Sequence, residues 1–111
     1  MTLPPLNGPR PLDRVNIDAA VTRKEPGAYA LGPVAIGRIT VLYVGRAESD
    51  LAERLKQHIG IYSHFTWIYA SSPKRAFEIE CEMYHTWMPA DNHAHPTRLS
   101  ETRWTCPVCG E

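Results

Sequence analysis

Five side chains spread along this 111-residue sequence are of the types that phosphoryl-transfer chemistry needs. They are two phenols, a guanidinium, a carboxylate and an amide: Tyr29, Tyr43, Arg54, Glu80 and Asn92. A carboxylate can hold a hard metal ion, a guanidinium can stabilise charge developing on a phosphate, and a phenol can handle a proton. Gathered at one place, such a set would suit metal-dependent hydrolysis of a phosphodiester bond.

A second group of side chains has the spacing of a metal site. Cys106 and Cys109 form a Cys-x-x-Cys motif, which by itself is half of a zinc site. Cys81 and His85 are four residues apart on a predicted helix and therefore share a face. Together the four predict a Cys3His zinc site that staples the tail to this helix, the alternative being unligated thiols in a frayed tail. Two histidines of the intervening segment are rival ligands, His93 and His95.

Length and charge limit what the chain can be. Its 111 residues suffice for one domain with one core. The formal net charge of zero argues against a strong non-specific nucleic-acid binder. Residues 38–75 nevertheless carry six Lys or Arg and three acidic residues, whereas residues 76–92 carry four acidic residues and no Lys or Arg. This pattern suits a metal site beside a phosphate path, although two solvated helix faces would produce it too.

The sequence also carries weak indications of location. No apolar run approaches the roughly 18 residues needed to span a bilayer, and the N-terminus lacks the pattern of a signal peptide. We therefore expect a cytoplasmic protein whose three cysteines are thiols or metal ligands, not disulfides.

The elements that must position these residues follow from turn residues and periodicity. Residues 1–25 are expected to form a proline-rich arm without regular structure, apart from a short helix within 12–21, and to cover an edge of the domain. Strands are expected at 29–31, 39–44 and 65–70. Helices are expected at about 50–59, where Asp50 and Glu53 have capping-box spacing, and from the N-cap Ser72 to Trp87.

The resulting element order defines the expected fold. The order β-β-α-β-α predicts an α/β (α+β) fold, a small sandwich with a three-stranded antiparallel sheet flanked by helices. We expect residues 26–95 to form this domain and residues 96–111 to form a tail that carries the Cys-x-x-Cys motif.

The order and spacing of these residues resembles the GIY-YIG nuclease domain over residues 26–92. In the strands the resemblance rests on two segments, Gly27-Ala28-Tyr29 and Leu42-Tyr43-Val44-Gly45-Arg46-Ala47. In the first helix Arg54 follows Leu51 by three residues. In the second helix and beyond it, the matching positions are Ala76, Glu80, Met83, Tyr84 and Asn92. The sequence departs from the family in having Ala28 in place of Ile and one extra residue before Arg54.

The resemblance implies a role for each site residue. Tyr29 would take the proton of an attacking water, Tyr43 would orient water or the metal's ligands, and Glu80 would hold Mg²⁺ or Mn²⁺. Arg54 would bind phosphate oxygens, and Asn92 would tie its loop to the domain. The basic stretch supplies three further candidates for substrate binding: Gly45, Arg46 and Lys56.

Two alternatives remain open at the level of residues. Glu80 lies on an otherwise apolar helix stripe with Ala76, Met83 and Trp87, where a charge is costly unless paired or metal-bound. A buried salt bridge with Arg54 is the alternative to the metal role. Glu78 and Glu82 are expected on the solvated side of the same helix. A free phenol titrates near pH 10, so a histidine with a more suitable pKa is an alternative base, namely His58.

The expected function is therefore an endonuclease, a hydrolase that cleaves phosphodiester bonds by water attack, with DNA as the favoured substrate and RNA as the alternative. The alternative is a non-catalytic, zinc-stabilised module of the same fold that binds nucleic acid or protein. Neutral charge and the lack of room for a separate DNA-binding domain favour this alternative, or an enzyme that depends on a protein partner for targeting.

Overall fold

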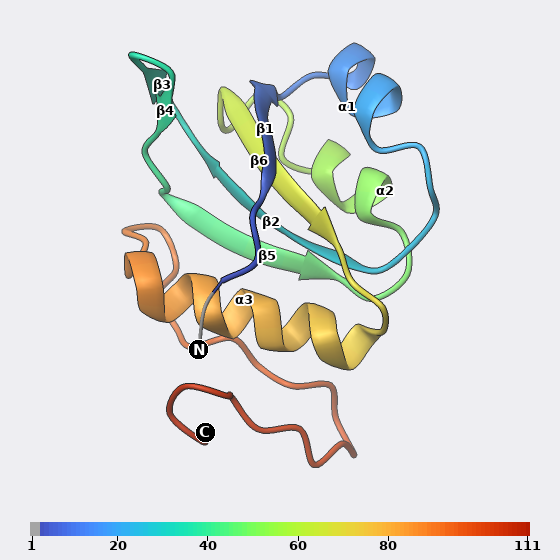
Figure 1. Ribbon diagram of the computed structural model, residues 1–111, viewed down its shortest axis with the longest axis vertical. Coiled ribbons are helices and arrows are strands. Elements are labelled where there is room, and N and C mark those ends of the chain that lie inside the picture. Colours follow the sequence, from blue (N-terminus) through green and yellow to red (C-terminus); the bar gives the residue numbers. More distant parts are fainter. Residues whose placement is uncertain (1–2) are drawn as a thin grey trace.

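A computed structural model describes residues 3–111. Its centre is a four-stranded antiparallel sheet with the order β1-β6-β2-β5. The strands of this sheet are β1 (Asn7–Pro11), β2 (Gly27–Gly32), β5 (Tyr43–Ala47) and β6 (His64–Tyr69). A two-stranded hairpin, β3 (Val34–Ala35) and β4 (Arg38–Ile39), projects beyond one end of the sheet (Figure 1).

Helices cover both faces of the sheet, which confirms the predicted sandwich. The short helices α1 (Arg14–Ala20) and α2 (Leu51–Lys56) lie on one face, and the long helix α3 (Pro73–Trp87) lies on the other (Figure 1). Successive side chains along β2 point to opposite faces of the sheet, so the strand contributes to the core on each face. Tyr29 and Leu31 pack in the core beneath α1 and α2, whereas Ala28 and Ala30 pack against α3.

The N-terminal arm differs from its prediction. Residues 7–11 form β1 and pair with β6, so the sheet has four strands rather than three. Prolines are tolerated there because an edge strand has one side without hydrogen-bonding partners. The expected helix is present as α1, with Asp13 as N-cap, and its Ile17 is fully buried in the core. The arm covers an edge of the sheet, as expected, but it is also part of the core.

The second strand lies later in the sequence than predicted. The β-branched residues favour a strand over 39–44, but the strand that pairs with β2 is β5, Tyr43–Ala47. The residues between them form the β3–β4 hairpin, whose turn contains Gly37 at φ +71°. The shift places Gly45 directly opposite Tyr29.

The helix ends follow local capping chemistry. The Asp50 side chain accepts a hydrogen bond from the Glu53 amide at the start of α2. The Ser72 side chain does the same for Arg75 at the start of α3, with Pro73 in the first turn. α3 ends at Trp87, as predicted, because Met88 takes a left-handed conformation. α2 ends at Lys56, three residues earlier than predicted.

The last part of the chain forms a further layer outside α3. Residues 88–111 contain no helix or strand. The segment first passes beside β5, where Asn92 contacts Val44, and its last part runs along the side of α3 that faces away from the sheet (Figure 1). There Trp104 and Cys106 pack against Phe77 and Cys81 of α3. Within residues 3–111, no helix combines the length and the apolar character needed to cross a membrane.

Candidate active site and metal centre

A cavity of about 300 Å³ opens beside β5, the strand at one edge of the sheet. Because α2 and α3 cover opposite faces of the sheet, both can reach this edge. Four of the five predicted catalytic residues line the cavity: Tyr29, Tyr43, Arg54 and Glu80. The remaining lining residues come from β5, α2 and the loops around them, and from the tail: Gly45, Arg46, Glu48, Gln57, His58 and Thr97.

The Tyr29 ring reaches the cavity by crossing Gly45 on the neighbouring strand. A side-chain carbon at position 45 would lie 2.5 Å from the Tyr29 hydroxyl and 2.6 Å from its ring carbon Cζ. Glycine is therefore required because any larger residue would displace the phenol. Gly45 also lines the cavity, so its predicted role in substrate binding stays a prediction beside this steric one.

The Tyr29 hydroxyl lies 2.9 Å from Nε2 of His58. Burial, and then the neighbouring Tyr43, raises the pKa of Tyr29, with Arg54 opposing the shift. Burial and Arg54 lower the pKa of His58, so its imidazole is neutral at pH 7. Neutral His58 can therefore accept the Tyr29 proton on Nε2. His58, the alternative base, therefore lies within hydrogen-bond distance of Tyr29, the residue predicted to take the proton.

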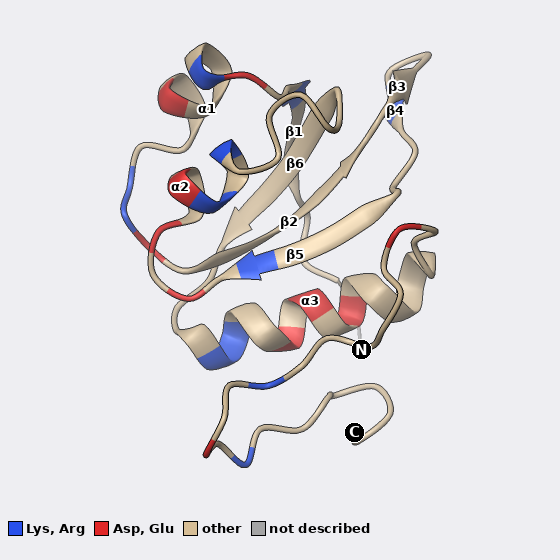
Figure 2. Ribbon diagram, turned by 180° about the vertical axis from the view of Figure 1, so that it is seen from behind, with Lys and Arg blue, Asp and Glu red and all other residues tan. Residues whose placement is uncertain are grey.

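Glu80 belongs to an ion network centred on Arg46. Its Oε1 accepts a hydrogen bond of 2.8 Å from Nη1 of Arg46, while Nε of Arg46 bonds Glu48 at 2.9 Å and Nη2 bonds the Thr97 carbonyl at 2.6 Å. Figure 2 shows the basic end of β5 above the acidic turns of α3. Each of the three guanidinium nitrogens thus makes a hydrogen bond, so Arg46 positions the two carboxylates at the cavity that it also lines. The salt-bridge partner of Glu80 is Arg46, not Arg54.

Glu80 itself is only 8% exposed. Burial raises its pKa, and the hydrogen bond and charge of Arg46 oppose that shift. The side chain keeps 10% of its surface accessible, and among residues 3–111 no hydrogen bond engages Oε2. One carboxylate oxygen therefore remains available at the cavity.

The other two basic residues predicted to act at the site, Arg54 and Lys56, lie in different places. Arg54 is exposed at the cavity, where the only hydrogen bond of its guanidinium within residues 3–111 is a 3.4 Å contact with the Gln57 side chain. Its guanidinium is available to an anion. Lys56 instead forms a 2.7 Å ion pair with Asp18, which links α2 to α1 away from the cavity. The structure gives Lys56 no place at the candidate substrate site.

Asn92 lies outside the cavity and completes the hydrogen bonding of β5. The Val44 amide donates to its Oδ1 at 2.8 Å, and its Nδ2 donates to the Val44 carbonyl at 3.0 Å. The side chain thus replaces a neighbouring strand along the free edge of β5. Asn92 ties its loop to the sheet, as expected, and does not join the residues that line the cavity.

Two acidic residues of the region were not identified correctly from the sequence. Glu82, expected on the solvated side of α3, is only 3% exposed and pairs with Arg75 at 3.3 Å. The tail layer buries it, and helical periodicity gives no sign of such a layer. Glu48 follows directly after the end of β5, pairs with Arg46 and lines the cavity, and its position two residues after Arg46 is the signal in the sequence that indicates this pair.

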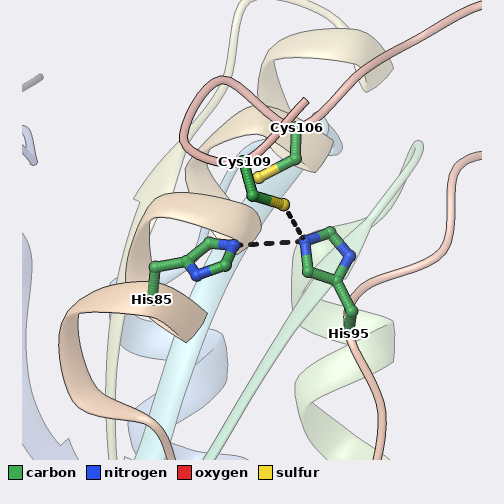
Figure 3. A group of neighbouring side chains, drawn as sticks. All are labelled: His85, His95, Cys106 and Cys109. Carbon is green, nitrogen blue, oxygen red and sulfur yellow. Dashed lines mark hydrogen bonds between the residues drawn. The ribbon is translucent and has the colours of Figure 1, made fainter. Parts of the chain in front are cut away.

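The tail and α3 together form the candidate metal centre (Figure 3). One ligand atom from each of four residues lies within 4.8 Å of the other three: His85, His95, Cys106 and Cys109. Three of these belong to the predicted set. Cys81 does not join them, because it packs behind Cys106 in an apolar cluster, where burial and Cys106 raise the pKa of its thiol. His95, the rival ligand, takes its place, while His93 is exposed outside the group.

The orientations within this centre suit metal binding. Nε2 of His95 lies 3.2 Å from Nε2 of His85 and 3.4 Å from Sγ of Cys109. The other ring nitrogen of His95, Nδ1, donates to the Pro96 carbonyl at 2.8 Å, which leaves Nε2 unprotonated as a ligand.

The Cys-x-x-Cys turn favours the thiolate form of its first cysteine. Burial opposes ionisation of Cys106, but the backbone amides of Cys109 and Val108 and the imidazole of His95 lower its pKa to about 6. The His2Cys2 centre could therefore hold a metal such as zinc.

The chain matches no protein-family model, no curated protein and no solved structure. The resemblance to the GIY-YIG domain thus stays a prediction from the sequence. Any functional inference rests on the geometry described above.

Proposed function

We propose that this protein is a metal-dependent nuclease that hydrolyses phosphodiester bonds in DNA. The observation that carries the proposal is the cavity beside β5, which joins Tyr29, Tyr43, Arg54 and Glu80 although they come from four separate elements or their ends. These are the groups that phosphodiester hydrolysis requires. Neutral net charge and the small size of the cavity suit a nuclease that a protein partner brings to its substrate.

The donors at the cavity fit a hard divalent cation. Glu80 has a carboxylate oxygen without a hydrogen bond in residues 3–111, and Glu48 lies on the same guanidinium with 30% of its side chain exposed. Carboxylate oxygens are the ligands that Mg²⁺ and Mn²⁺ prefer. Glu80, assisted by Glu48, would hold the ion, which supplies a water of lowered pKa and neutralises phosphate charge.

The proton path avoids a free phenolate. Because the pKa of Tyr29 is raised, its hydroxyl does not ionise near neutral pH. It can instead take the proton of an attacking water while it passes its own proton to Nε2 of His58, 2.9 Å away. Arg54, exposed at the mouth, binds the phosphate oxygens and stabilises their charge in the transition state.

We assign the His2Cys2 centre to zinc with a structural role. Two imidazoles and two thiolates are a typical tetrahedral zinc set, and bonds of about 2.0–2.3 Å give ligand separations of about 3.3–3.8 Å. The observed contacts of 3.2 and 3.4 Å already lie near that range. Replacement by Co²⁺ should give the absorption of a tetrahedral thiolate complex, and Cys81→Ser should keep it whereas His95→Ala should lose it.

Cleavage of duplex, branched and single-stranded DNA, and of RNA, with and without Mg²⁺ or Mn²⁺ tests the proposed activity. Glu80→Gln should abolish metal-dependent cleavage while the protein stays folded. Glu78→Gln is the matched control, since Glu78 is on the same helix but pairs with Arg75 outside the cavity. Arg54→Ala should lower the rate by roughly 10²-fold.

Two results would decide against catalysis. Equal rates for Glu80→Gln and wild type would show that any cleavage is a contaminant or uses another site. If the purified protein binds nucleic acid or a protein partner but cleaves none of these substrates, the non-catalytic, zinc-stabilised module is the correct description.

A further inference from the structure

Arg46 is the point at which the candidate active site and the metal centre meet. On one side its guanidinium holds Glu48 and Glu80 at the cavity. On the other side its Nη2 donates to the Thr97 carbonyl. Thr97 is only two residues after the metal-centre residue His95, and it also lines the cavity.

A second route connects the tail to the same guanidinium. Arg46 lies over the ring of Phe77, with its Cζ 5.1 Å from the ring centroid. Phe77 in turn packs against Trp104, at a centroid distance of 5.8 Å, and belongs to the same buried cluster as Cys106. Arg46 is thus held from two directions by parts of the tail that adjoin the metal centre.

The metal centre lies at both ends of the tail, residues 96–111, which contains no helix or strand: His95 directly precedes the tail, and Cys109 is near its end. Besides the metal centre, the tail is held by the Arg46–Thr97 hydrogen bond and by the packing of Trp104 and Cys106 against Phe77 and Cys81. Without a metal, the four donor groups would add only weak contacts to these. A bound metal would fix both ends of the segment to His85 of α3.

We propose that metal binding at the His2Cys2 centre positions Arg46, and through it the Glu48 and Glu80 carboxylates, for catalysis. Arg46 acts here as a positioning residue, because its effect on the reaction would pass through the two carboxylates that it holds. The inference rests on the proposed nuclease function for its catalytic consequence, but the positioning itself can be observed without any substrate.

The test compares the zinc-loaded wild type with two variants that remove ligands from opposite ends of the segment, His95→Ala and Cys109→Ser. Cys109→Ser leaves residues 95–97 unchanged, so an effect common to both variants comes from loss of the metal. His93→Ala is the matched control, because His93 is an exposed histidine two residues from His95 and outside the centre. Metal content is measured by mass spectrometry for each protein.

The substrate-independent readout is the ¹H–¹⁵N NMR signal of the Arg46 guanidinium. In the wild type and in His93→Ala, rotation about its Nε–Cζ bond should be hindered and separate Nη signals should appear, because both Nη groups are bonded. In the two metal-free variants the Nη signals should merge. Unchanged, separate signals in the metal-free variants would overturn the inference.

Cleavage kinetics with saturating Mg²⁺ give the second readout. The two variants that lack zinc at the His2Cys2 centre should lose about 10- to 100-fold in kcat, the range expected for misplaced catalytic groups. Their KM should be nearly unchanged. Wild-type kcat in a metal-free variant would overturn the inference and leave the nuclease proposal standing. Metal-dependent Arg46 signals in a protein that cleaves nothing would support the positioning and overturn the nuclease proposal.

Discussion

At the scale of single residues, the contact between Tyr29 and Gly45 determines where the phenol lies. Gly45→Ala should destabilise the fold by about 1–3 kcal/mol, since the added carbon would meet the Tyr29 ring within 2.6 Å. Because Gly45 has no left-handed backbone conformation to protect, the cost would be steric. Denaturant unfolding measures the stability. Gly37→Ala is the control, because there an added carbon meets nothing within 4 Å and only its φ of +71° is strained. A neutral Gly45→Ala would contradict the packing described for Tyr29.

His58 provides a pH-dependent contribution to stability. Burial and Arg54 lower the pKa of His58 in the folded state, below the value of about 6.5 for an unfolded chain. Its contribution is therefore fully present above about pH 6.5 and is lost as the pH falls through the folded-state pKa. His58→Gln should flatten the dependence of the unfolding free energy on pH between about pH 7.5 and 5. If wild type and variant, both zinc-loaded, lose stability in parallel over this range, another group is responsible.

At the scale of the elements, β5 depends on a side chain for its outer hydrogen bonds. Asn92→Ala should cost about 1–3 kcal/mol, because the Val44 amide and carbonyl lose their partners at a buried position. Hydrogen exchange of the Val44 amide should accelerate more than exchange in β6, which is paired on both sides. Asn92→Asp keeps an oxygen that can accept from the Val44 amide but has no donor for the Val44 carbonyl. It should therefore be destabilised less than Asn92→Ala. Normal protection of Val44 in Asn92→Ala would show that the loop is held by other contacts.

The elements also show how far local sequence signals reach. α3 could be predicted to the residue, because its N-cap, its Pro73 and its end before Pro89 are all local signals. β5 could not, because its position depends on which residue faces Tyr29, and that is a property of the strand pair. β1 was missed for the same reason. Its prolines argue against a strand, and only the unoccupied edge of β6 provides a place for one.

At the scale of the whole molecule, the metal should join the tail to α3 and thereby make it part of one cooperative unit with the rest of the fold. If zinc is present at 100 times its dissociation constant, it contributes about 2.7 kcal/mol, or roughly 10 °C in melting temperature for a domain of this size. A chelator should remove that contribution, and calorimetry measures it. Cys106→Ser should lower the melting temperature as the chelator does, and the chelator should not lower the melting temperature of this variant further. A melting temperature that no chelator changes would rule out a structural metal.

The candidate site was partly predictable for reasons that appear only at this scale. The resemblance to the GIY-YIG domain, together with residue types and spacing, was enough to name the cavity residues Tyr29, Tyr43, Arg54 and Glu80. They could not show that Arg46 would pair with Glu80, because that contact joins an edge strand to a helix from another layer. Likewise, helix periodicity put Cys81 beside His85, but the path of the tail brings His95 to the metal centre, and Cys81 packs with Phe77 and Cys106 instead.

The two outer edges of the sheet have a further consequence, for association between copies of the chain. An exposed strand edge is a template on which another molecule can add a strand, and this is a common route to aggregation. Here neither edge offers a regular row of free backbone groups. β1 carries Pro9 and Pro11 and an irregular register against β6, and β5 has the groups of Val44 occupied by Asn92. The same features that complete the fold therefore protect this small protein from polymerising through its sheet.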